Sequence, residues 1–106
     1  MNTTFELMTI DTLYRQQITA LCNQHHVETL YLFGSAAKGK LKESSDIDLL
    51  VKFKQFALEN YFNNYMDLKD KLKLLFNREI DLVEAQTLKN PYLIKSINSS
   101  KELLYG

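Results

Sequence analysis

Apolar residues recur along this chain with two different periods, and these periods predict where helices and strands lie. Over residues 10–22 they follow the three- and four-residue spacing of an amphipathic helix. The same spacing returns over residues 58–76 and predicts a longer helix with one broad apolar face. Asn90 and Pro91 are residue types that favour a helix start, so a further helix is expected over residues 90–97.

Four other segments have the pattern of β-strands. Residues 27–33 (VETLYLF) are rich in β-branched and aromatic types and stop at Gly34. Residues 46–53 (DIDLLVKF) are apolar on both faces in their middle, which favours a central strand of a covered sheet. Residues 78–85 alternate as a shorter strand does, and residues 102–106 are expected to close the sheet. The pattern predicts an α/β (α+β) fold, with a mixed sheet of about four strands packed with three or four helices.

Composition narrows the classes of protein that fit. The chain has 106 residues, of which 45% are hydrophobic, and it shows no repeat or linker, so residues 1–106 are expected to form one small domain. Its 13 Lys and Arg balance 13 Asp and Glu, so direct nucleic-acid binding is not expected. A single cysteine, a start unlike a signal peptide and the lack of a long apolar run predict a soluble cytoplasmic protein without a membrane span.

Two aspartates begin the most apolar strand. Asp46 and Asp48 are two residues apart, so their side chains should project from one face while Ile47 projects from the other. Two carboxylates held close together repel each other unless a cation lies between them, and oxygen ligands favour Mg²⁺ or Mn²⁺. A solvated strand end with ordinary surface acids is the alternative for such a pair seen alone.

Further residues argue for a site at this position. Asp81 lies in a similar context on the next predicted strand, and a third carboxylate would complete a site for two metal ions. Gly34 and Ser35 follow the first strand and are expected to open a short helix, whose free backbone N–H groups suit a phosphate or form an ordinary cap. Lys38 could add positive charge, although spaced lysines are also typical of a solvated surface.

The combination resembles the core motif of the DNA polymerase β-like nucleotidyltransferase superfamily. The pair Gly34-Ser35, ten intervening residues, Asp46-Ile47-Asp48 and the downstream Asp81 match that motif, and the similarity covers residues 27–105. In its brevity the chain is similar to the minimal nucleotidyltransferase branch, whose members include MntA-like antitoxins.

The resemblance implies an enzyme that transfers a nucleoside monophosphate, most simply AMP from ATP, to a hydroxyl group. Asp46 and Asp48 are then expected to bind two Mg²⁺ ions, and Asp81 to help one ion deprotonate the acceptor. Gly34 and Ser35 would hold the β- and γ-phosphates.

The family pattern also has one departure and implies a partner. Where members often have arginine, Lys38 keeps the charge without the bidentate fork, so it bears on triphosphate affinity. Minimal members often pair with a HEPN-domain toxin, and some transfer AMP to its tyrosine, so such a toxin is the expected partner. Two alternatives stay open: an antitoxin that neutralises its HEPN partner by binding alone, and transfer to a small molecule such as an antibiotic. A homo-oligomer could build the pocket that the latter needs.

Other conspicuous residues have simpler interpretations. His25 and His26 are expected to end the first helix without a catalytic role, and Cys22 is expected to be a small core residue. Aromatic residues gather over residues 61–66, where most are expected in the core. If Phe62 or Met66 is exposed, the stretch becomes a candidate docking patch for a partner.

Overall fold

The predicted helices and strands form in the order that the sequence indicates. The computed structural model describes residues 15–34, 46–55 and 58–106. Its elements in this part of the chain are α2 (Arg15–Gln24), β1 (Val27–Phe33), β2 (Ile47–Phe53), η2 (Leu58–Asn60), α4 (Tyr61–Phe76), β3 (Ile80–Glu84), η3 (Ala85–Thr87), α5 (Pro91–Ser100) and β4 (Glu102–Tyr105).

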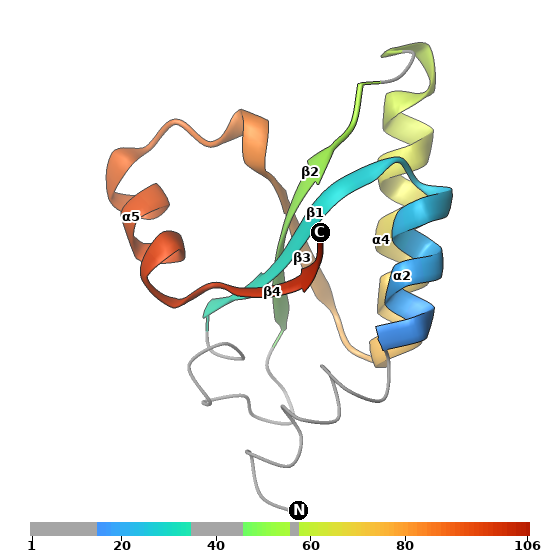
Figure 1. The fold of residues 1–106 in the computed structure, drawn as a ribbon, viewed down its shortest axis with the longest axis horizontal. Helices are drawn as coiled ribbons and strands as arrows, with labels where there is room; N and C mark the ends of the chain where they lie inside the picture. The colour runs from blue at the N-terminus through green and yellow to red at the C-terminus, as the bar shows by residue number, and fades with distance from the viewer. Residues whose placement is uncertain (1–14, 35–45, 56–57) are drawn as a thin grey trace, which may run out of the picture.

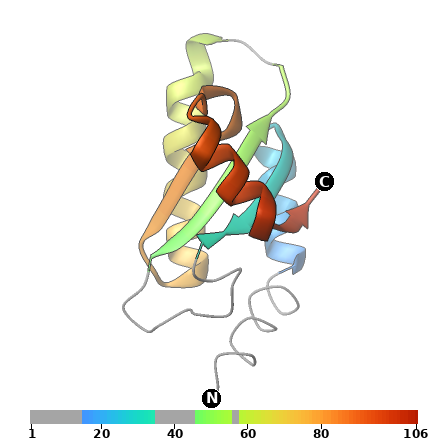
Figure 2. The same ribbon diagram turned by 90° about the vertical axis from the view of Figure 1, so that its left-hand side faces the viewer.

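The four strands form one mixed sheet, which confirms the expected α+β architecture. Their order is β3-β2-β1-β4. Strand β1 pairs antiparallel with both β2 and β4, whereas β2 and β3 run parallel. Figure 1 shows α2 and α4 side by side on one face of the sheet and α5 on the other side, and Figure 2 shows α5 crossing in front of the strands.

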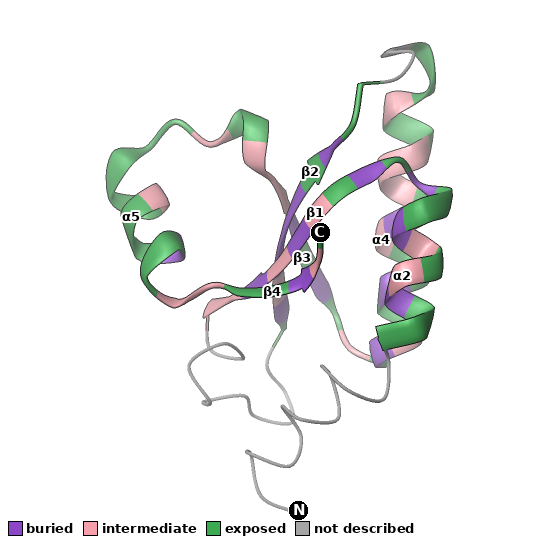
Figure 3. Ribbon diagram, viewed as in Figure 1, coloured by how far each residue is buried: buried purple, intermediate pink, exposed green. Residues whose placement is uncertain are grey.

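The main core lies between the sheet and the two helices α2 and α4. Burial colours in Figure 3 mark the inner sides of these helices and the strands that face them. Strand β2 is central, as its composition predicts, and its residues Ile47, Leu49 and Val51 are fully buried in this core. Leu50 is also buried but lies outside the core cluster, because alternate residues of a strand point to opposite faces.

Helix α2 confirms the first predicted helix over the residues that the structure describes. Ile18 and Cys22 are buried one turn apart, and the helix continues to Gln24, two residues beyond the predicted end. Residues 10–14 of that prediction lie outside the described residues. His26 has a positive φ of 59°, a conformation that cannot continue a helix.

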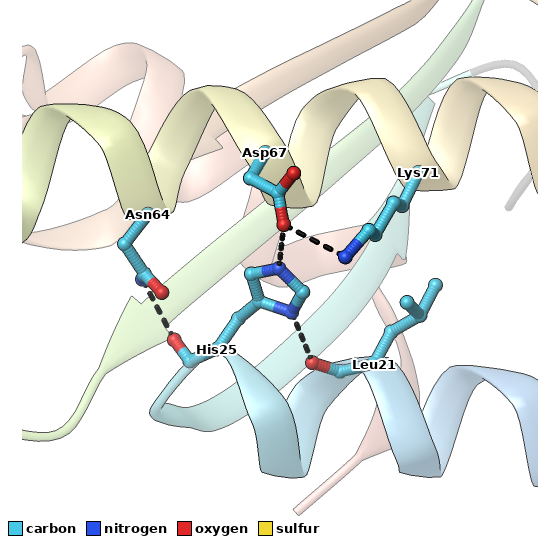
Figure 4. A network of polar contacts seen from close by, with 5 residues as sticks. All are labelled: Leu21, His25, Asn64, Asp67 and Lys71. Atoms are coloured by element: carbon cyan, nitrogen blue, oxygen red, sulfur yellow. Dashed lines mark hydrogen bonds and ion pairs between the residues drawn. The ribbon is translucent and has the colours of Figure 1, made fainter.

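His25 joins the end of α2 to the middle of α4. The residue is only 4% exposed. Its Nδ1 lies 2.7 Å from the Leu21 carbonyl oxygen, and its Nε2 lies 2.6 Å from an Asp67 carboxylate oxygen. That same oxygen lies 2.9 Å from the Lys71 ammonium, and the Asn64 amide donates to the His25 carbonyl (Figure 4). His25 follows the last residue of α2, where the sequence predicts a helix end, and its contacts join that end to α4.

Helix α5 begins as the sequence predicts and then lies largely in solvent. The Asn90 side chain accepts hydrogen bonds from the backbone N–H groups of Tyr92 and Leu93, and Pro91 occupies the first helical position. Ile97 is the buried residue of this helix. Within the described ranges, no helix combines the length and the apolar character needed to cross a bilayer.

Candidate active site

Two of the predicted acids lie side by side because β2 and β3 run parallel in register. Asp48 pairs with Asp81, and the pairs before and after them are Ile47 with Ile80 and Leu49 with Leu82. These flanking apolar residues are buried under α2 and α4, so the two aspartates project from the opposite face. We call this side of the sheet, with Tyr31, Phe33, Asp48 and Asp81, the acid face.

Asp46 lies outside the strand. It is exposed and immediately precedes β2, whose first residue, Ile47, donates its N–H to the Glu79 carbonyl oxygen at 2.9 Å. Its negative charge nevertheless raises the pKa of the Asp48 carboxyl, so the two carboxylates interact. The spacing of Asp46 and Asp48 predicts two carboxylates close to each other, and this interaction is consistent with that prediction.

The electrostatics of Asp48 show that these carboxylates act on one another. Partial burial raises the pKa of the Asp48 carboxyl, and the negative charges of Asp81 and then Asp46 raise it further. The ionised form of Asp48 is therefore less favourable in the protein alone than in a free aspartate. A cation on the acid face would remove this repulsion.

Gly34 lies so close to the Asp48 side chain that there is no space for a side chain of its own. It follows β1, whose last residue Phe33 pairs with Asp48, and it has a φ of 72°. A Cβ at this position would lie 2.3 Å from the Asp48 carboxylate oxygen Oδ2, far closer than atoms can approach. Glycine is needed both for the backbone conformation and for the space that Asp48 occupies.

The glycine–serine motif predicts a phosphate site but does not reveal this contact with Asp48. The signal that could have found it is the strand register, which appears only when β1 and β2 are paired. Ser35 and Lys38, the other predicted phosphate contacts, lie outside the described residues.

The acids fit a divalent cation in chemistry, although they do not form a finished cage. Among the described residues, no three acidic, histidine or cysteine side chains converge closely enough to hold a metal ion. Mg²⁺ usually takes only one or two protein carboxylates, with water and phosphate oxygens as its other ligands. The pair of Asp48 and Asp81, with the exposed Asp46 beside it, suits that donor set.

Sequence reasoning did not identify a cation on the acid face. The Lys101 ammonium lies over the Tyr31 ring, 4.3 Å from its centroid. Tyr31 lies two residues before Phe33 on β1 and therefore faces the same side as Asp48. No sequence signal links these residues, because Lys101 follows α5, seventy positions along the chain.

Comparisons with known proteins agree with this geometry. The chain matches the family described as "Polymerase beta, Nucleotidyltransferase" over residues 16–106. It is 34% identical over 101 residues to a Methanocaldococcus jannaschii protein provisionally named protein adenylyltransferase MJ1379, and the match covers 93% of this chain and 96% of that protein.

Solved structures share the fold. One that is provisionally identified as a minimal nucleotidyltransferase has a TM-score of 0.74 and 26% identity, and the match covers 96% of this chain and 95% of the other. A chain in a structure of the tri-AMPylated Shewanella oneidensis HEPN toxin in complex with MNT antitoxin has a TM-score of 0.63 and 21% identity, covering 91% of this chain and 72% of that one. With its strand acids paired beside Gly34 and the family match over residues 16–106, the chain belongs to the polymerase beta nucleotidyltransferase family.

Proposed function

We propose that this chain is a Mg²⁺-dependent protein adenylyltransferase that transfers AMP from ATP to a tyrosine hydroxyl of a HEPN-domain toxin and so acts as its antitoxin. The observation that carries the proposal is the in-register pairing of Asp48 with Asp81 on a sheet face that carries no part of the main core. Family membership supports nucleotidyl transfer, and the relative from Methanocaldococcus jannaschii supports a protein as the acceptor.

Asp46, Asp48 and Asp81 are the residues that would hold the metal. Two Mg²⁺ ions, or Mn²⁺ in their place, would neutralise the triphosphate and lower the pKa of the attacking hydroxyl when bound. The raised pKa of Asp48 supports this assignment, because burial and its acidic neighbours leave the carboxylate in need of a counter-charge.

The residues of the chain supply positioning and a proton acceptor. The acceptor oxygen forms a bond to the α-phosphorus of ATP, the bond from that phosphorus to the bridging oxygen breaks, and pyrophosphate leaves. Asp81 is exposed on the acid face and can accept the proton that the hydroxyl loses. Gly34 and Ser35 are proposed to hold the β- and γ-phosphates through backbone N–H groups, with Lys38 adding charge.

The partner is proposed from the neighbouring structures. An MNT antitoxin in complex with an AMPylated HEPN toxin shares the fold of this chain. Asp46 and Asp81 are exposed, so a large acceptor could reach them in a way that a closed small-molecule pocket would not allow. This accessibility favours a protein acceptor over an antibiotic.

The experiment supplies the purified chain with Mg²⁺, a HEPN-domain protein from the same genome, and ATP labelled on either the α- or the γ-phosphate. The expected result is label on the HEPN protein from the α position alone. Asp48→Asn and Asp81→Asn should abolish labelling. Asp70→Asn is the matched control, because Asp70 is an exposed acid on α4, on the other side of the sheet.

The same experiment separates the alternatives. If the wild type transfers no label, while it and Asp48→Asn silence the HEPN protein equally, the chain is an antitoxin that works by binding. Label that enters only a small-molecule fraction, such as an added aminoglycoside, would place the acceptor outside the protein class. A tyrosine as the modified residue is checked by mass spectrometry of the labelled band.

A further inference from the structure

A groove runs along the free edge of the sheet, between β3 and the first turns of α4. Its volume is about 400 Å³, and we call it the edge groove. Strand β3 is an edge strand in the order β3-β2-β1-β4. The groove therefore opens beside the sheet, next to the strand that carries Asp81. It is lined by Tyr61, Phe62, Tyr65, Leu82, Val83, Glu84 and Thr87.

Aromatic rings form one wall of the edge groove. Tyr61 and Tyr65 are stacked, with centroids 6.5 Å apart and an interplanar angle of 16°, and both pack against the core. Phe62 is 70% exposed, which satisfies the condition under which the sequence indicates a docking patch. A large apolar side chain that lies in solvent beside a groove is typical of a surface that a partner covers.

Glu84 provides a carboxylate oxygen in the groove that can accept a further hydrogen bond. One carboxylate oxygen accepts a hydrogen bond from the Tyr61 hydroxyl at 2.6 Å. The other oxygen, Oε1, is buried and has no hydrogen-bond partner among the described residues. A buried carboxylate oxygen without a donor destabilises the protein, because it has lost its water without gaining a hydrogen bond. A cationic donor that enters the groove would relieve this cost, and electron-rich rings beside it favour a cation further.

The edge groove is lined by residues that directly follow Asp81, one of the proposed catalytic acids, on β3. Burial raises the pKa of the Tyr65 hydroxyl, and the negative charges of Asp81 and Glu84 raise it further, so Tyr65 interacts electrostatically with both carboxylates. The Tyr65 hydroxyl also donates a hydrogen bond to the carbonyl oxygen of Leu82, which lies between Asp81 and Glu84 in β3. This hydrogen bond joins α4 to β3. Glu84 follows Asp81 by three residues, so their Cα atoms lie about 10 Å apart along β3, but their side chains point to opposite faces of the sheet. Because β3 is an edge strand, a partner can reach both faces by passing around its free edge.

We infer that the edge groove receives a basic side chain of the acceptor protein, held between the aromatic wall and Glu84 while the acceptor hydroxyl reaches Asp81. This inference deepens the proposed function and rests on it for the identity of the acceptor. It adds a specificity rule: the acceptor carries a basic residue that enters the edge groove on the α4 side of β3 while the modified hydroxyl lies on the acid face, around the free edge of that strand.

The first test needs only this chain. N-acetyl-arginine amide is titrated into the isotope-labelled protein, with N-acetyl-glutamine amide as the uncharged comparison, and resonances of Tyr61, Tyr65 and Thr87 are followed by NMR. Shifts with the arginine probe alone, lost in Glu84→Gln, support the inference. Absent shifts, or shifts that Glu84→Gln leaves unchanged, overturn it.

The second test measures affinity for the HEPN-domain protein without ATP, so that binding is read apart from catalysis. Glu84→Gln and Phe62→Ala are each expected to weaken binding at least tenfold. Leu74→Ala is the control, because Leu74 is 80% exposed on the same helix but does not line the edge groove. Phe62→Ala keeps the test decisive should Glu84→Gln disturb folding.

The outcomes of the second test separate this inference from the proposed function. Transfer to the HEPN protein with equal affinity in all three variants would overturn the inference and leave the function standing. If Glu84→Gln and Phe62→Ala weaken binding but the wild type transfers no AMP, the inference stands and the proposed function is overturned. Self-association of the chain that disappears in Phe62→Ala would assign the groove to a second copy and overturn the inference.

Discussion

Replacing Gly34 with alanine tests the contact between the glycine motif and the strand acids. The new Cβ would lie 2.3 Å from Asp48 Oδ2, about 1 Å short of the roughly 3.3 Å at which carbon and oxygen make contact. Because Gly34 has a φ of 72°, alanine also adds a conformational cost of about 1–2 kcal/mol. Asp48 or the backbone must therefore move by about 1 Å.

Stability and catalysis should respond to this change on very different scales. A displacement of about 1 Å at a reacting centre can lower the rate about 100-fold. A loss of about 1–2 kcal/mol lowers Tm by no more than about 16 °C in a domain of this size. We expect Gly34→Ala to fold and to lose about 100-fold in kcat/KM for labelling by α-labelled ATP.

Gly106→Ala is the matched control for backbone strain. Gly106 also has a positive φ, of 125°, and its added Cβ would meet Thr29 Cγ2 at 2.8 Å, away from the acids. It should lower Tm, measured by thermal unfolding, without a comparable loss of transfer. Equal transfer by the two variants would refute the view that Gly34 makes room for Asp48.

Three further predictions follow from the shifted pKa values. The pKa of Asp48 is raised, so the stability contributed by its protonated form is present below the usual value of 3.8 and is lost as pH rises through the folded pKa. At neutral pH, Asp48→Asn should therefore raise the Tm of the metal-free protein, and a lower Tm would contradict this. Hydrogen bonds from His25 and then Lys71 lower the pKa of Asp67, so the stability that its carboxylate contributes is present at neutral pH and is lost as pH falls through the folded pKa. In a plot of Tm against pH, Asp67→Asn should make the decline at acidic pH shallower. An unchanged decline would count against the interaction of Asp67 with His25 and Lys71. Burial raises the pKa of the Cys22 thiol to about 12, so a thiol reagent at mildly alkaline pH should label it only after unfolding, and rapid labelling of the native protein would show that the site is open.

Local patterns were sufficient to predict most of the secondary structure. The Asn90 cap, the central position of β2 and the helical spacing over residues 58–76 depend on neighbours in sequence, and the structure confirms all three. The interaction between Asp46 and Asp48 also involves neighbours in sequence, two residues apart. The position of Asp81 on a strand, between Ile80 and Leu82, likewise follows from an alternation that is visible in the letters alone.

What the sequence could not determine is every relation that depends on strand pairing or helix packing. The register that puts Asp48 beside Asp81, and Phe33 beside Asp48, is set by hydrogen bonds between segments distant in the chain. The space that Gly34 leaves for Asp48, the Lys101 cation over Tyr31 and the unpartnered oxygen of Glu84 all arise from this packing.

Sequence by itself therefore determined which elements form and which residue types could carry the chemistry. Periodicity and capping are local effects, so the order of letters is enough to predict them. Tertiary structure alone decided which carboxylates repel each other, where a glycine makes room and which edge of the sheet stays open. Those properties are distances between side chains, and only the folded sheet brings the residues close enough for charge and shape to act.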